Sequence, residues 1–70
     1  MKININVKDL DENQKSKLRG IIHFFNGERN NIGIKITNKE RVDPAGSMLY
    51  NEKIHKEIVD VIGEDNIKFE

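Results

Sequence analysis

Two segments of this chain alternate strictly between apolar and polar residues, and this period of two constrains the fold more than any other feature. The alternating apolar residues are Ile3, Ile5 and Val7 in KININV and Ile32, Ile34 and Ile36 in IGIKIT. Successive side chains of a strand point to opposite faces, so each segment predicts a strand with one buried face. A sheet built from such strands needs a second layer to cover its apolar side.

The C-terminal segment 66–70 predicts a further strand, with Ile67 and Phe69 inward and Lys68 outward. The isoleucine and the phenylalanine are again two positions apart, as the strand period requires.

The alternation of apolar and polar residues is weaker between residues 38 and 50. We expect a turn at Asn38-Lys39 and a short third strand within 40–42. The following Asp-Pro-Ala-Gly, residues 43–46, is expected to interrupt that strand, because proline cannot donate a ladder hydrogen bond. Residues 48–50 are expected to resume an extended path.

Helical periodicity lies between these strands. The first predicted helix covers 12–25, and its apolar stripe consists of Leu18, Ile21, Ile22 and Phe25. Asp11 and Gln14 have the spacing of a capping box at its start. Gly27 is expected to end it in the left-handed conformation.

The second predicted helix covers 52–62, with an apolar stripe of Ile54, Ile58, Val61 and Ile62. Asn51 is its expected N-cap, and Gly63 is expected to stop it in the same way as Gly27.

The order strand, helix, strand, strand, helix, strand predicts an α+β fold. We expect a two-layer βαββαβ sandwich of the ferredoxin-like or split βαβ kind. Two helices would cover one face of a four-stranded, mainly antiparallel sheet. Seventy residues suffice for one domain, 1–70, and for no second one.

Charge and cysteine content bear on nucleic-acid binding and on the cellular location of the protein. Twelve basic and twelve acidic residues cancel, whereas nucleic-acid binding usually brings a basic excess. The predicted outward residues of the first, second and last strands include no aromatic side chain for base stacking, so we expect no direct sequence-specific nucleic-acid binding. The chain has no cysteine, no long apolar run and no signal-peptide core, which indicates a cytoplasmic protein.

No catalytic signature is visible. His23 and His55 lie singly on the two predicted helices without a metal-ligand spacing. Ser16 and Ser47 have no nucleophile-elbow glycines beside them. The carboxylates fall at helix ends and on solvated faces. We expect no catalytic residue, metal or cofactor in this chain.

The glycines of FFNGERNNIGIKI raise the possibility of a phosphate-binding loop, but the order of elements excludes it. A phosphate loop leads from a strand into a helix and ends in GK[ST], whereas this segment leads from a helix into a strand.

Several apolar side chains exceed what one small core needs, and grouped apolar residues on a surface mark a partner contact. The residues that we expect to form a protein contact are Phe24, Met48, Leu49 and Tyr50.

Four stretches together resemble the extreme C-terminal domain of the bacterial replicative DNA polymerase III alpha subunit. They are INVKDLDENQKSKLRGII, FFNGERNNIGIKI, VDPAGSMLYNEKIHKEIVDVIG and GEDNIKF. The best matching positions are Gly27, Gly63, Glu64 and Asn66. Asn26 and Asn31 stand where the family often has proline.

This resemblance implies a fragment of a larger polymerase whose catalytic aspartates lie in other domains. It further implies an interaction module in DNA replication that contacts other replisome proteins, notably the clamp-loader tau subunit. The fold-level analogy supplies no site residues.

Another reading stays open, a regulatory domain of the ACT type, which shares the βαββαβ order and binds small molecules such as amino acids. The segment 7–12 lacks the glycine expected at such a site. A small acylphosphatase-like enzyme is a more remote alternative, because no phosphate-cradling loop with an arginine follows the first strand.

Overall fold

The structure is a computed structural model that describes all residues 1–70. Its elements in chain order are β1 (Lys2–Asn6), α1 (Glu12–Phe24), β2 (Ile32–Asn38), β3 (Arg41–Met48), α2 (Glu52–Ile62), the short 3₁₀ helix η1 (Glu64–Asn66) and β4 (Ile67–Phe69).

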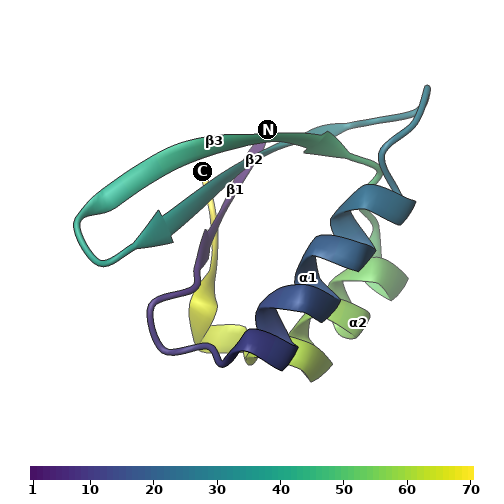
Figure 1. Cartoon of the computed structure of the whole chain (residues 1–70). Coiled ribbons are helices and arrows are strands. Elements are labelled where there is room, and N and C mark those ends of the chain that lie inside the picture. Colours follow the sequence, from purple (N-terminus) through teal and green to yellow (C-terminus); the bar gives the residue numbers. More distant parts are fainter.

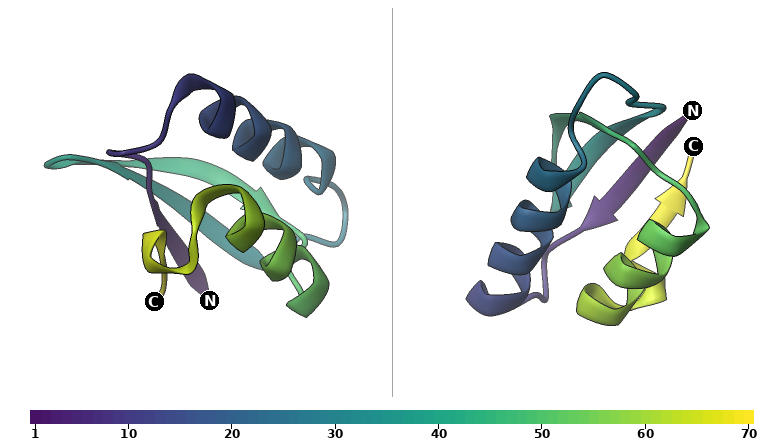
Figure 2. Two further views of the ribbon diagram at one scale, coloured as in Figure 1. Left: turned by 90° about the horizontal axis from the view of Figure 1, so that it is seen from below. Right: turned by 90° about the vertical axis from the view of Figure 1, so that its right-hand side faces the viewer.

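The four strands form one mixed sheet in the order β3-β2-β1-β4. β1 pairs in parallel with β2, while β2 with β3 and β1 with β4 are antiparallel pairs. Both helices lie on one face of this sheet, side by side and antiparallel (Figures 1 and 2). The predicted two-layer βαββαβ sandwich is therefore confirmed, and within it β1 and β2 are hydrogen-bonded neighbours.

The core lies between the sheet and the helices and is entirely apolar. Its buried residues are Ile3, Ile5, Val7, Leu10, Leu18, Ile32, Ile34, Met48, Tyr50, Ile54, Ile58 and Ile62. The alternating isoleucines of β1 and β2 face the helices as predicted. Ile36 is only half-buried, because the β2–β3 hairpin extends past the helices (Figure 1).

The helix starts are those that the sequence predicted. Asp11 and Gln14 form the full capping box of α1: Asp11 Oδ1 accepts from the Gln14 N–H at 2.8 Å, and Gln14 Oε1 accepts from the Asp11 N–H at 2.9 Å. Asn51 Oδ1 accepts from the Ile54 N–H at 3.0 Å and caps α2.

The two glycines after the helices behave differently. Gly63 ends α2 with φ of 87°, a backbone conformation that favours glycine, and its N–H donates to the Val59 carbonyl at 2.8 Å. Gly27 has no positive φ, so the predicted left-handed stop at this residue is wrong. α1 ends instead at Phe24 with Phe25 as its C-cap, and the Gly27 N–H donates to Asn30 Oδ1 at 2.9 Å.

The third strand is longer than predicted. β3 continues through Pro44, so the expected interruption at residues 43–46 is wrong. β3 is an edge strand, where a residue without an N–H is tolerated. A register shift between Gly33 and Lys35 accompanies Gly46, which has φ of 87°. The hairpin turn is at Lys39-Glu40, one residue later than expected, and Lys39 has φ of 60°.

β4 is short and forms the other edge of the sheet. Ile67 and Phe69 pair with Ile5 and Ile3, so both point to the helix face as predicted. Phe69 is nevertheless 55% exposed, because it lies at the rim of the sheet. Its ring contacts those of Tyr50 and His55.

Neither helix is long and apolar enough to cross a membrane.

Candidate functional site

Two of the four residues predicted to contact a partner belong to the core. Met48 is fully buried and Tyr50 is 9% exposed, so neither side chain lies at the surface where the sequence predicted a contact. Met48 pairs with Ile32 at the end of β3 and therefore faces the helices, as Ile32 does. The sequence pattern missed this because β3 was expected to break before it reached Met48.

Phe24 is the predicted contact residue that the structure leaves open to solvent, with 79% of its surface exposed. It lies among half-buried apolar residues that line two adjoining shallow grooves. We call this surface the Phe24 patch. It consists of Ile21, Phe24, Phe25, Leu49 and Val61.

Contacts inside the chain hold this patch together. The Phe24 and Phe25 rings meet edge to face, with centroids 5.0 Å apart. The Leu49 N–H donates to the Phe25 carbonyl at 2.8 Å, which ties the chain after β3 to the end of α1. Leu49, a predicted contact residue, is thereby placed in the groove below Phe24.

Two asparagines fix the loop that leads from α1 to β2. Asn30 Nδ2 donates to Asn26 Oδ1 at 2.8 Å and to Ser47 Oγ at 2.9 Å. Asn31 exchanges two hydrogen bonds with the backbone of Tyr50. No local pattern predicts these side-chain bonds, and only the high asparagine content of NGERNN is typical of such a loop.

Charged residues of both signs surround the patch. Lys17 and Glu57 line the groove between the two helices, and Glu28 and Arg29 line the groove at the end of α1. An apolar centre within a polar rim of mixed charge is the usual anatomy of a protein–protein contact.

The two histidines lie on different helices and in different surroundings. His23 is exposed on α1, while Nδ1 of His55 is hydrogen-bonded to the Tyr50 hydroxyl. Burial raises the pKa of Tyr50 to about 12. The Tyr50 and His55 rings also meet edge to face, with centroids 5.8 Å apart.

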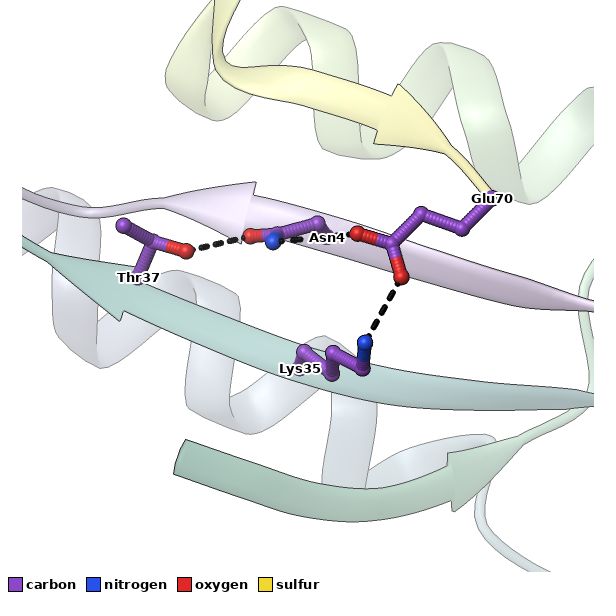
Figure 3. A network of polar contacts seen from close by, with 4 residues as sticks. All are labelled: Asn4, Lys35, Thr37 and Glu70. Carbon is purple, nitrogen blue, oxygen red and sulfur yellow. Dashed lines mark hydrogen bonds and ion pairs between the residues drawn. The ribbon is translucent and has the colours of Figure 1, made fainter. Parts of the chain in front are cut away.

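The open face of the sheet carries a polar network (Figure 3). Lys35 Nζ lies 2.8 Å from Glu70 Oε1, Asn4 Nδ2 donates to Glu70 Oε2 at 3.3 Å, and the Thr37 hydroxyl donates to Asn4 Oδ1 at 2.6 Å. The hydrogen bonds from Lys35 and Asn4 lower the pKa of Glu70. Each group has its partner within the chain, so the network joins β1, β2 and the end of β4.

No three histidine or carboxylate side chains gather as metal ligands would. Ser47 accepts its hydrogen bond from Asn30, and Ser16 is exposed on α1. No family model, curated protein or solved structure matches this chain.

Proposed function

We propose that this domain is a non-catalytic protein-interaction module and that it binds its partner through the Phe24 patch. The observation that carries the proposal is the exposure of Phe24, 79%, at the centre of a contiguous apolar surface. Buried aromatic anchors supply much of the binding energy of protein interfaces. Phe24 is positioned to become such an anchor.

The rigidity of the surface supports this proposal. The Phe24 ring meets Phe25 edge to face, and the neighbouring loop is held by hydrogen bonds of Asn30 and Asn31. A surface that is already ordered loses little conformational entropy when a partner binds.

The resemblance described above supplies the proposed context. We propose that the domain belongs to the C-terminal region of a bacterial replicative DNA polymerase III alpha subunit and works in the cytoplasm. Its partner is another replisome protein, with the clamp-loader tau subunit as the first candidate. DNA synthesis would be the task of other domains of the parent polymerase.

The test is a titration of the purified domain with a purified clamp-loader tau subunit, in which biolayer interferometry measures the dissociation constant. We expect Phe24→Ser to weaken binding by at least about tenfold, because it removes an apolar anchor. Val42→Ser is the matched control, since Val42 is 52% exposed on the hairpin, away from the patch.

Equal binding of wild type and Phe24→Ser would overturn the assignment of the surface. Absence of binding to the tau subunit would overturn the proposed partner.

A further inference from the structure

A second groove lies on the flank of α1 that faces away from α2. It has a volume of about 440 Å³. Its apolar residues are Val7, Leu18, Ile22, Ile36 and Ala45, and its polar ones are Lys15, Arg19, His23 and Asn26. We call it the hairpin groove, because Ile36 and Ala45 belong to the β2–β3 hairpin, which extends past the helices (Figure 1).

Basic side chains follow one edge of this groove at a regular interval. Lys15, Arg19 and His23 are each four residues apart on α1. With a rise of 1.5 Å per residue, neighbouring members are about 6 Å apart along the helix axis. The row therefore repeats with the spacing of one helical turn.

The charges around the groove leave a positive balance. Lys15 and Arg19 line the groove, and no acidic residue does. The Lys15 Nζ lies 3.8 Å from Oε1 of the exposed Glu12, a weak ion pair. On the hairpin, Asp43 is paired with Arg41 at 2.8 Å and adds no net charge. Arg19 forms no ion pair in the chain. An acidic ligand complements this edge.

The neighbouring edge strand is poorly suited to pair with another strand. Pro44 lacks an N–H, and the irregularity at Gly46 disturbs the register of β3. Proline and bulges at an edge oppose the addition of a further strand. A helix laid along α1 needs no hydrogen bonds from that edge, and its acidic residues at i, i+4 and i+8 match the row of basic residues.

We propose that the hairpin groove binds an acidic amphipathic helix of a partner protein. Its apolar face would cover Ile36, Ala45 and Ile22, while its acidic residues would meet Lys15 and Arg19. This helix-in-groove mode requires apolar anchors and acidic residues at helical spacing in the same segment. The site is separate from the Phe24 patch and can be tested independently of it.

The test uses two labelled peptides of one composition and fluorescence anisotropy at physiological ionic strength. In the first, leucines and glutamates follow the helical period on adjoining faces; in the second, their order is scrambled. We expect the periodic peptide to bind wild type at least about tenfold more tightly. The double substitution Lys15→Glu with Arg19→Glu should remove most of that preference.

Lys53→Glu with Lys56→Glu is the matched control, because it reverses the same number of charges on exposed positions of α2. It should change affinity by less than about twofold, since salt screens charges beyond about 8 Å. Circular dichroism melts confirm that each variant is folded. Phe24→Ser should bind the periodic peptide like wild type.

Three results would each overturn the inference. They are equal binding of the periodic and scrambled peptides, an equal loss in the two charge-reversal variants, and a loss in Phe24→Ser. Tight binding of a strand-forming acidic peptide, with none of the helical one, would likewise contradict it.

Discussion

Asn31 and Tyr50 are joined by two reciprocal hydrogen bonds. The Tyr50 N–H donates to Asn31 Oδ1 at 2.7 Å, and Asn31 Nδ2 donates to the Tyr50 carbonyl at 2.9 Å. This pair connects the start of β2 with the segment after β3, next to Leu49 of the Phe24 patch. One asparagine side chain thus satisfies two backbone groups of the segment that precedes α2.

We expect Asn31→Ala to lower the free energy of unfolding by about 2 kcal/mol, because two partly buried backbone groups lose their partner. Urea denaturation measures this change. Asn38→Ala, at the exposed end of β2, should change stability by less than about 0.5 kcal/mol. Equal effects of the two substitutions would show that the Asn31 side chain has no special role.

Gly63→Ala and Gly27→Ala form a second comparison. An added Cβ meets nothing within 4 Å at either position, so only the backbone differs. Gly63 has φ of 87°, and we expect alanine there to cost about 1–3 kcal/mol of stability. Gly27 has no positive φ, so alanine there should be neutral or slightly stabilising. A large loss of stability in Gly27→Ala would mean that Gly27 has a positive φ, as a left-handed helix stop requires.

The ionisation of Tyr50 gives a third test. Because Tyr50 is the only tyrosine of the chain and there is no tryptophan, phenolate absorbance reports on this residue alone. Its pKa of about 12 lies above the ordinary value of about 10. The stability from the neutral phenol is therefore complete below pH 10 and is lost as the pH rises from 10 toward 12. Ultraviolet absorbance of phenolate should show little ionisation of the folded protein at pH 10.5. Ionisation with a midpoint near 10 would mean that the ring is exposed.

Glu70 supplies a test at acidic pH. Its pKa is lowered by the hydrogen bonds from Lys35 and Asn4, so the native state favours the carboxylate. This stabilisation is present above the ordinary glutamate pKa of about 4.3 and is lost as the pH falls through the lower, folded-state pKa. Glu70→Gln should therefore lower the urea midpoint at pH 7 and have less effect at pH 2.5. An equal difference in urea midpoint between wild type and Glu70→Gln at both pH values would contradict a stabilising role of the Glu70 carboxylate.

The fold followed from periodicity wherever a segment had one buried face. Ile3 and Ile5 alternate in β1, and Ile54, Ile58 and Ile62 recur along α2, as burial in the structure requires. β3 lacks such a pattern, because the hairpin extends past the helices and leaves Val42, before the expected break, and Pro44, within it, both exposed. Its pairing with β2 is set by contacts distant in sequence, which local pattern cannot reveal.

The candidate site was partly predictable for a similar reason. Phe24 lies at the edge of the α1 stripe, and a helical wheel places it near the surface. The burial of Met48 and Tyr50 depends on the length of β3, and the clamp formed by Asn30 and Asn31 depends on how the hairpin returns to the loop. The basic row of the hairpin groove becomes apparent only when α1 is placed beside the hairpin.

The most direct test of the proposed interaction surface is an NMR titration of the isotopically labelled domain with the unlabelled clamp-loader tau subunit. We predict the largest changes in amide signals at Ile21, Phe24, Phe25, Leu49 and Val61, with little change at Asn4, Lys35 and Thr37 on the open sheet face. Changes centred on the open sheet face, or no saturable change at all, would contradict the account.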